Sequence, residues 1–272
     1  MSNPALRIVL TSSRAAGVLA AASGLLLLAN VLVIFVRVQL GHPHFLGLNR
    51  LFDLNREANI PTLFSTALFL INCGLLFLAG KADRNSANPF VRYSWMMLGL
   101  VFLFLALDEG VGLHEMLMQF VRRHFNANGV FHFAWVIPYG LATILLAFVT
   151  WPWFQKLDTR TRWLFGSSAA LFVAGAIGME MVNGRYLESI HLVEDLTYHS
   201  MIMLEESLET GGLILFSYSL LDFIERQEGM EFTVAIRRKA AEVAVAAEAR
   251  VILTAAGGRV TASENPASPP RR

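Results

Sequence analysis

The chain has 272 residues, of which 55% are hydrophobic and only 16% are charged, and its formal net charge at pH 7 is +1. Soluble domains usually carry about 25% charged residues, so this composition indicates a polytopic membrane protein. The small net charge is uninformative about nucleic acid, but no basic patch with interleaved aromatic residues appears, and we expect no nucleic-acid partner. The single cysteine, Cys73, excludes an internal disulfide and a cysteine-based zinc motif.

The apolar runs predict six membrane-spanning helices, since a span needs about 20 apolar residues. They cover residues 15–38, 61–80, 93–116, 131–151, 162–182 and 198–221. The first run is longer than the apolar core of a signal peptide, which has about 7 to 15 residues, so we interpret it as an uncleaved span. The predicted fold class is all-α: a transmembrane bundle over residues 1–222, then a cytoplasmic tail over 223–272. In that tail we expect a short amphipathic helix followed by a disordered end.

The distribution of Lys and Arg predicts the orientation of the chain. With the N-terminus inside, the inner segments carry most of the basic residues, although the first outer loop also has Arg37, Arg50 and Arg56. Because inner loops are enriched in Lys and Arg, this bias favours both termini in the cytoplasm.

The outer ends of the predicted spans carry acids and histidines that a bilayer should exclude. They fall in two stretches, LALDEGVGLHEML and TYHSMIMLEESLET, which are otherwise apolar enough to span. An ionisable group at the bilayer centre costs about 2.5 to 3.5 kcal/mol on insertion scales. These groups must therefore be paired, hydrated, protonated or bound to something.

Under this topology the acids converge on one leaflet. The third span runs outward, so residues 108–115 occupy its last turns, and Asp108 and Glu115, seven residues apart, share a face. The sixth span runs inward and carries a stripe at His199, Glu206 and Glu209. Lipid would not tolerate such a stripe, so it must face the bundle interior or a hydrated cleft.

Carboxylates mixed with imidazoles suit Zn, Fe or Mn, so the cluster is a candidate metal site. The expected ligands are Asp108, His199, Glu206, Glu209, Glu57, Glu180, His114 and Glu115. Glu109 and Glu205 are the candidate general acid–base residues. However, the chain has no His-Glu-x-x-His or His-x-x-x-His motif, and no Glu-x-x-His occurs among the residues of the cluster, so a metal-free cluster that shares protons is an equal alternative.

Other features have simpler interpretations. Glu188, Glu194 and Asp195 fit solvated charges at the outer interface, and Arg56 or Arg185 would neutralise part of the cluster as ion pairs. The small residues of the fifth span, Gly175 among them, predict close approach of a neighbouring helix.

Three strings carry a resemblance to a known family: FDLNREANIPTLFSTALFL, FLALDEGVGLHE and LEESLETGG. Over roughly residues 52–221 the chain resembles a family of bacterial multi-pass membrane proteins of unassigned function. The resemblance implies a fold and a location in the bacterial cytoplasmic (inner) membrane, but no activity.

The chain also has a faint similarity to metal-dependent membrane hydrolases of the alkaline ceramidase kind. They too place an acidic segment, a mid-chain Asp and helical His residues at one membrane face. This chain departs from them in lacking a His-x-x-x-His pair, in its higher acid content and in having six predicted spans.

Three functions therefore stay open from the sequence. One is a membrane metalloenzyme that acts on a lipid or another apolar substrate at the outer leaflet. The second is a proton- or cation-coupled transporter. The third is a non-catalytic subunit or assembly factor of a larger membrane complex, in which the acids hold helices together.

Overall fold

The computed structural model describes residues 6–38, 40, 47–125, 128–228 and 232–236. The chain divides into two units, Leu10–Phe232 and the two ends of the chain together, Met1–Val9 with Thr233–Arg272. The strands β1 (Leu6–Leu10) and β2 (Phe232–Ile236) pair in a two-stranded sheet. The helix and the disordered end predicted for the tail lie outside the described residues.

The unit Leu10–Phe232 is helical. Its elements are α1 (Ser12–Val38), α2 (Leu48–Phe52), α3 (Ile60–Ala82), α4 (Pro89–Val111), α5 (Leu113–Phe125), the short 3-10 helix η2 (Gly129–Phe131), α6 (Val136–Phe154), α7 (Thr159–Val173), the π-helix η3 (Ala174–Met179), α8 (Glu180–Ser189) and α9 (Leu196–Glu228). In the described part of the chain, five segments are long and apolar enough to cross a membrane: α1, α3, α4, α6 and the continuous α7–η3–α8. The predicted bundle of membrane-length apolar helices is thereby confirmed for this unit, while the strands β1 and β2 were not predicted. The glutamate-bearing helix α9 is not among the five.

Local sequence explains where α3 and α4 begin. Asn59 precedes α3, and its side chain accepts a hydrogen bond from the backbone N–H of Thr62 at 3.0 Å. Asn88 caps α4 in the same way through Phe90. Each cap is followed by a proline in the first helical turn, where the missing N–H costs nothing.

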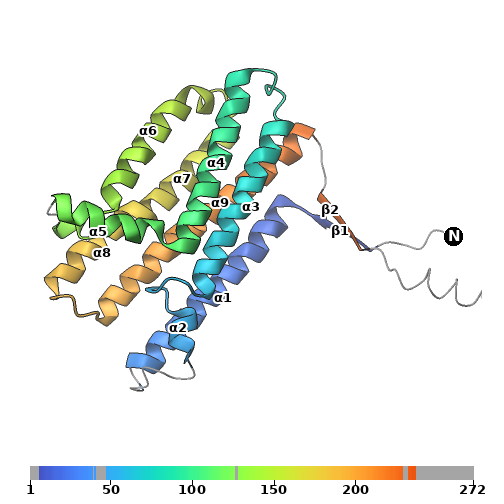
Figure 1. The fold of residues 1–272 in the computed structure, drawn as a ribbon. Helices are drawn as coiled ribbons and strands as arrows, with labels where there is room; N and C mark the ends of the chain where they lie inside the picture. Colours follow the sequence, from blue (N-terminus) through green and yellow to red (C-terminus); the bar gives the residue numbers. More distant parts are fainter. Residues whose placement is uncertain (1–5, 39, 41–46, 126–127, 229–231, 237–272) are drawn as a thin grey trace, which may run out of the picture. The chain divides into compact units, whose positions relative to one another are not determined.

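The end of α4 differs from the sequence prediction, which ran the third span to residue 116. The helix stops at Val111 because Gly112 adopts the left-handed conformation, with φ of 70°. The carboxylate of Glu57 occupies the space that a Cβ of residue 112 would need. His114 and Glu115 therefore belong to a separate amphipathic helix, α5, which runs across the end of the bundle (Figure 1).

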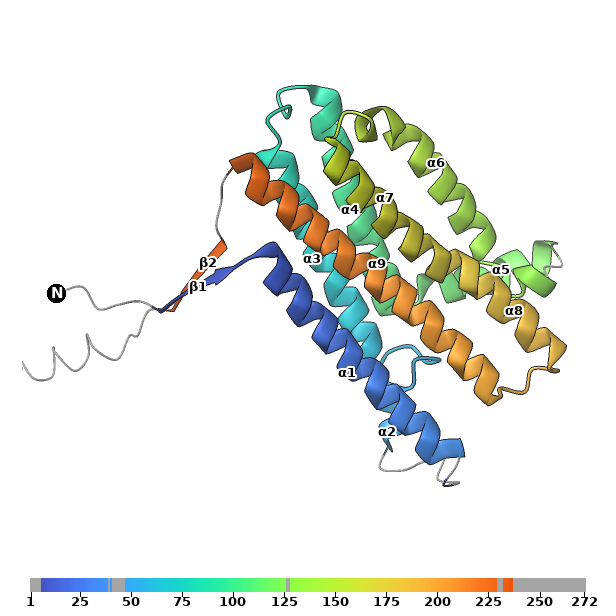
Figure 2. The same ribbon diagram turned by 180° about the vertical axis from the view of Figure 1, so that it is seen from behind.

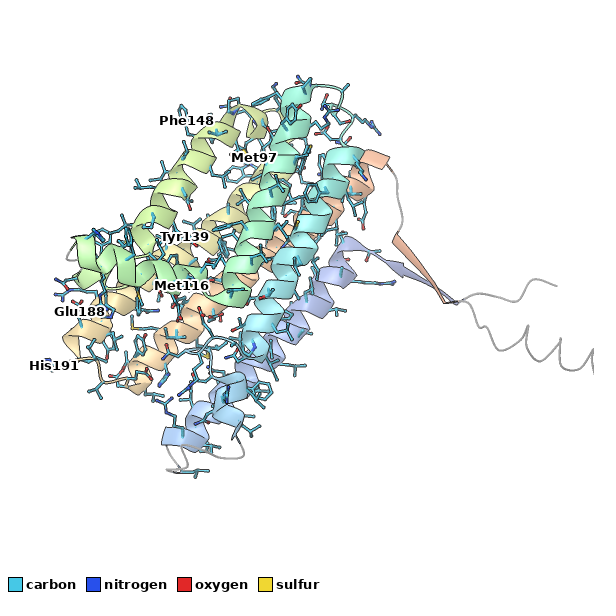
Figure 3. All side chains as sticks on the ribbon, in the orientation of Figure 1. Met97, Met116, Tyr139, Phe148, Glu188 and His191 are labelled. Atoms are coloured by element: carbon cyan, nitrogen blue, oxygen red, sulfur yellow. The ribbon has the colours of Figure 1, made fainter. Side chains whose placement is uncertain are left out.

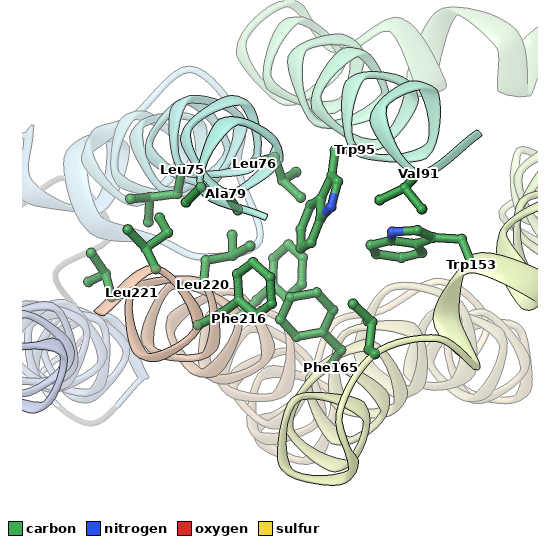
Figure 4. Close-up of a cluster of buried hydrophobic side chains, with 14 residues drawn as sticks. Leu75, Leu76, Ala79, Val91, Trp95, Trp153, Phe165, Phe216, Leu220 and Leu221 are labelled. Carbon is green, nitrogen blue, oxygen red and sulfur yellow. The ribbon is translucent and has the colours of Figure 1, made fainter. Parts of the chain in front are cut away.

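The long helix α9 forms the centre of the bundle, with α1, α3 and α7 packed along it (Figures 1 and 2). The largest hydrophobic cluster lies at the end of the bundle away from α5 (Figure 4). In it, the Trp95 ring meets the Trp153 ring edge-on, with centroids 4.8 Å apart. The indole N–H of Trp95 donates to Asp83 at 2.9 Å, so this buried carboxylate has a partner.

Glycines bring α9 against α7 and η3, as the sequence predicted for Gly175. A Cβ at Gly175 would lie 2.7 Å from Cγ of Glu209, and one at Gly212 would lie 2.7 Å from the backbone N of Phe172. π-helical turns often mark functional positions, and here η3 lies against the part of α9 that carries the glutamates.

Acids at the end away from α5 are matched by arginines. Asp222 accepts from Arg160 and from Arg226, each at 3.0 Å, and Arg226 also pairs with Asp158 at 3.3 Å. Charge is thus balanced locally at this end of the bundle.

Candidate functional site

The first part of the candidate site is built around His114, at the junction of α4 and α5. Its Nε2 lies 3.0 Å from Glu57 and its Nδ1 lies 3.4 Å from Asp108. The Asp108 carboxylate also accepts the backbone N–H of His114 at 2.8 Å, so it caps the first turn of α5. The hydroxyl of Tyr139, on α6, is within hydrogen-bonding reach of the same carboxylate (Tyr139 is labelled in Figure 3).

These contacts determine the charge of the imidazole. Burial opposes the protonated form, but the hydrogen bonds and negative charges of Asp108 and Glu57 outweigh it and raise the pKa of His114 to about 10. His114 is therefore a cation at neutral pH. Burial, and then the charge of Glu57, raises the pKa of the neighbouring Glu115 above its usual value.

Trp135, which directly precedes α6, joins this region to the interior. Its ring lies against the His114 ring, with centroids 5.1 Å apart. Its indole N–H donates to Glu180, the first residue of α8, at 3.0 Å. One tryptophan thus links the α4–α5 junction to the carboxyl groups between α8 and α9.

The second part of the site is a pair of carboxyl groups held between α8 and α9. The carboxyl groups of Glu180 and Glu205 lie within hydrogen-bonding reach of each other. Glu205 is only 7% exposed and accepts a 2.5 Å hydrogen bond from the side-chain amide of Asn183. A hydrogen bond between two carboxyl groups requires a proton on one of them, because ionised carboxylates only accept. Sharing one proton would satisfy both groups, whereas two adjacent negative charges would repel each other.

Three further glutamates, Glu109, Glu206 and Glu209, lie in the same region. Glu206 and Glu209 each lie within electrostatic range of both Glu109 and Glu180. Glu209 also lies within electrostatic range of His114. The chain of groups thus runs from Glu57, at the α5 end of the bundle, to the interior along α9.

The charge balance of this cluster differs from that at the other end of the bundle. Among the described residues, no arginine or lysine forms an ion pair with its seven carboxyl groups, and His114 is the one cationic partner. The seven are Glu57, Asp108, Glu109, Glu180, Glu205, Glu206 and Glu209. So many carboxyl groups close together, with Asp108 and Glu205 buried, are costly unless most of them carry protons or bind cations.

A transition-metal centre has no support in this geometry. Within the described residues, no group of three or more His, Cys, Asp or Glu side chains is arranged to hold a metal ion. The sequence predicted a metal site here. The described residues form a carboxyl cluster instead, without the ligand set that Zn, Fe or Mn prefers.

His199, expected in the same stripe as Glu206 and Glu209, lies beside other partners. It is 3% exposed, and its Nε2 is 3.6 Å from Glu194. Glu194 also binds Arg37 at 3.3 Å and Asn55 at 2.9 Å, and Arg37 pairs with the buried Asp53. Glu194 therefore connects Asn55, in the loop before α3, with Arg37 of α1 and His199 of α9.

A separate polar group lies around His132. Its Nδ1 is 2.8 Å from Glu188 and 3.1 Å from Arg122 (Glu188 is labelled in Figure 3). Glu188 also accepts the backbone N–H of Gly129 at 2.8 Å, so this carboxylate has several partners and ties α8 to η2 and α5.

Sequence reasoning missed Trp135 and Asn183 as members of the site. Neither residue is ionisable, and neither belongs to a motif in the sequence. Asn183 is fully buried, and its carbonyl oxygen has no hydrogen-bond partner among the described residues. A buried amide three residues after Glu180 on one helix was the available signal, since i and i+3 positions share a face.

The comparisons with known proteins name a family without assigning an activity. Residues 18–223 match the family model described as "Domain of unknown function (DUF8692)". This match covers most of the chain, so the chain belongs to that family. No curated protein and no solved structure matches it.

Proposed function

We propose that this chain is a proton-coupled membrane transporter whose carboxyl cluster takes up and releases protons. The observation that carries the proposal is the close approach of the Glu180 and Glu205 carboxyl groups between α8 and α9, held by Trp135 and Asn183 and with no Lys or Arg paired with either among the described residues. This pair can pass between singly protonated and ionised forms, and the neighbouring glutamates offer further acceptors. Intramembrane acids that face a bundle interior commonly form proton relays.

The arrangement of the cluster supports exchange with one side of the membrane. Glu57 is the exposed end, and the imidazole of His114 bridges it to Asp108. Trp135 and Glu180 continue the chain of contacts to the buried Glu205. A graded series of groups from exposed to buried is what proton transfer by short steps requires.

The proposal includes a topology of six spans with both termini in the cytoplasm. α9 is the sixth span, and its glutamates are tolerated because they face neighbouring helices and not lipid. Three arginines lie at the end away from α5: Arg84 just after α3, Arg160 in the first turn of α7 and Arg226 in the last turn of α9. Their position fits a cytoplasmic side. The membrane would be the bacterial cytoplasmic membrane, with the carboxyl cluster in its outer half.

An infrared titration of the purified protein tests the proton pair directly. Protonated carboxyl groups have a carbonyl band distinct from that of carboxylates. We expect such a band at neutral pH, reduced by one group in a Glu205→Gln variant. A matched Glu188→Gln variant should keep the band, because Glu188 accepts from a backbone N–H and pairs with His132.

Reconstitution tests the transport itself. Vesicles that contain the protein and a pH-sensitive dye should change their internal pH when an outward or inward proton gradient is imposed, and Glu205→Gln should abolish the change. Absence of the protonated band, or a stoichiometric Zn, Fe or Mn in the purified protein that is lost in the same variant, would overturn the proposal in favour of a metal centre.

A further inference from the structure

A groove runs lengthwise between α1 and α9, which lie side by side on one face of the bundle (Figure 2). Its volume is about 520 Å³, and six residues of each helix line it, from Ala16 to Leu27 on α1 and from Ser207 to Tyr218 on α9. None of these lining residues is Asp, Glu, Lys, Arg or His. The groove is therefore distinct from the carboxyl cluster and suits an uncharged, apolar part of a ligand.

The hydroxyl groups of the groove already have hydrogen-bond partners in the protein. Ser207 and Thr210 donate to backbone carbonyls of their own helix at 2.6 and 2.7 Å, and the Ser23 hydroxyl lies 3.2 Å from that of Thr210. The hydroxyl of Tyr218 accepts from Arg160 at 3.0 Å. A ligand in the groove is therefore held by apolar contact and not by hydrogen bonds.

Three glycines keep the groove wide. A Cβ at Gly17, Gly24 or Gly211 would meet nothing within 4 Å, whereas one at Gly212 would meet the backbone of α7. Glycine destabilises the interior of a helix relative to alanine. At these three positions the space left by the missing side chain is not used for packing within the described part of the chain, so it is open to a molecule from outside.

The dimensions of the groove match one hydrocarbon chain. Each wall spans eleven residue steps, or about 17 Å of helix, which compares with about 15 Å for the hydrocarbon of one leaflet. The volume divided by this length gives a mean cross-section of about 30 Å². A helix with its side chains is about 10 Å across and needs about 80 Å². A single extended chain thus fits inside the groove, whereas a helix of a second copy does not.

We infer that this groove binds one acyl chain of a phospholipid from the leaflet at the end of the bundle away from α5. The groove opens to the hydrocarbon, since the neighbouring Val18 and Leu25 of α1 are 66% and 68% exposed. Arg160, whose side chain is 56% exposed, contacts Tyr218 at the end of the groove nearest that membrane surface. A headgroup phosphate there would meet a guanidinium group while the acyl chain follows the groove.

The test measures phospholipid binding by the full-length protein in a steroid-based detergent, whose molecules have no linear alkyl chain to compete. After removal of native lipid, added palmitoyl-oleoyl phosphatidylglycerol should raise Tm by about 5 to 10 °C at 100 times its Kd. Native mass spectrometry should show one retained phospholipid per chain. Unchanged Tm together with no retained lipid would overturn the inference. Sodium oleate that binds as tightly as the phospholipid would also overturn it, in favour of a fatty-acid site.

Variants locate the acyl chain. Gly24→Leu and Gly211→Leu fill the groove from its two walls, and each should weaken phospholipid binding at least tenfold. Both should fold, because a Cβ at either position meets nothing within 4 Å. Val18→Leu is the matched control, since Val18 is exposed on α1 but does not line the groove, and it should bind as the wild type does.

Two results with these variants would overturn the inference. One is undiminished phospholipid binding by both Gly24→Leu and Gly211→Leu. The other is a wild-type dimer that both substitutions dissociate, which would make a second copy of the chain the occupant of this face.

The result is separable from that of the proposed proton uptake, because the groove does not depend on the protonation of Glu205. If the phospholipid binds but the protonated carboxyl band of Glu205 is absent, the proton proposal fails and the acyl-chain groove stands. If the band is present and no phospholipid binds, only the acyl-chain groove fails.

Discussion

At the scale of single residues, the polar groups of the site are held by hydrogen bonds to one another and not by ion pairs with arginine. Glu205 accepts a hydrogen bond from Asn183 and lies within hydrogen-bonding reach of Glu180, so its carboxyl group has two polar partners. Leaving a buried donor or acceptor without its partner costs about 1 to 3 kcal/mol. The consequences of changing Glu205 therefore depend on whether the replacement keeps hydrogen-bonding atoms.

We expect Glu205→Gln to fold with nearly wild-type stability and Glu205→Ala to lose about 3 kcal/mol more, because two partners are then unsatisfied. A glutamine can accept from Asn183 and either donate to or accept from Glu180, whichever carboxyl group carries the proton. Denaturation of the two variants in one detergent measures the difference. Equal losses of stability in Glu205→Gln and Glu205→Ala would contradict a proton shared with Glu180 and would indicate an ionised Glu205.

At the scale of elements, the contact between α7 and α9 depends on one of two adjacent glycines. A Cβ at Gly212 would lie 2.7 Å from the backbone N of Phe172 and 2.9 Å from the backbone O of Ser168, whereas a Cβ at Gly211 meets nothing within 4 Å. Backbone atoms cannot rotate away as a side chain can, so a methyl group at residue 212 must push the helices apart.

We expect Gly212→Ala to lower the free energy of unfolding by about 1 to 3 kcal/mol, as overpacking does. Gly211→Ala is the matched control on the same helix. It should be neutral or stabilising by about 0.5 to 1 kcal/mol, because alanine loses less chain entropy in a helix. Thermal melts of both variants test the pair, and similar melting temperatures would contradict the packing described here.

The junction of α4 and α5 is fastened by a protonated histidine. The hydrogen bonds and charges of Asp108 and Glu57 outweigh burial and raise the folded-state pKa of His114 to about 10 from an ordinary value of 6.5. A group whose pKa is raised by folding binds its proton more tightly in the folded state. Its stabilising contribution is complete below about pH 6.5 and is lost as the pH rises through about 10.

We therefore expect stability to fall between about pH 6.5 and 10, and His114→Gln to remove that part of the slope. His124→Gln is the control, since His124 is exposed on the same helix and binds the carbonyl of Phe120. Denaturant unfolding across this pH range measures the effect. Identical pH profiles for the wild type and His114→Gln would show that the imidazole carries no charge.

At the scale of the whole molecule, the two ends of the bundle differ in how their charges are balanced. At one end Asp158 and Asp222 pair with Arg160 or Arg226, and at the other end the carboxyl cluster has no arginine partner among the described residues. The proposed topology assigns the arginine end to the cytoplasm. An odd number of crossings would put the two ends of the chain on opposite sides.

We expect reporter fusions after Arg226 and within residues 122–128 to report opposite sides of the membrane, with the former cytoplasmic. This follows from six crossings, in which α9 returns the chain to the inner side. A fusion between Lys81 and Asn88, in the α3–α4 connection, is the internal control and should report the same side as Arg226. Same-side signals from the first two positions would contradict the six-span topology.

The sequence by itself determined the class of protein. Apolar runs of about 20 residues can be satisfied only in a membrane, and the acids of LALDEG and LEESLE cannot face lipid. Hydropathy and helical period are local properties, so they could be counted along the chain. They predicted the membrane-length helices, and the small residues of the fifth span predicted Gly175 at a close helix contact.

Only the tertiary structure decided which polar groups meet. Gly112 ends α4 because Glu57 fills the space beside it, which moves His114 and Glu115 onto α5. His199 lies next to Glu194, although its spacing put it in the stripe of Glu206. Trp135, just before α6, donates a hydrogen bond to Glu180, and Asn183, on α8, donates one to Glu205 on α9. The position of a residue along a helix predicts the direction in which its side chain points. Which side chain it meets depends on the rotation and shift of the neighbouring helix, which only the tertiary structure gives.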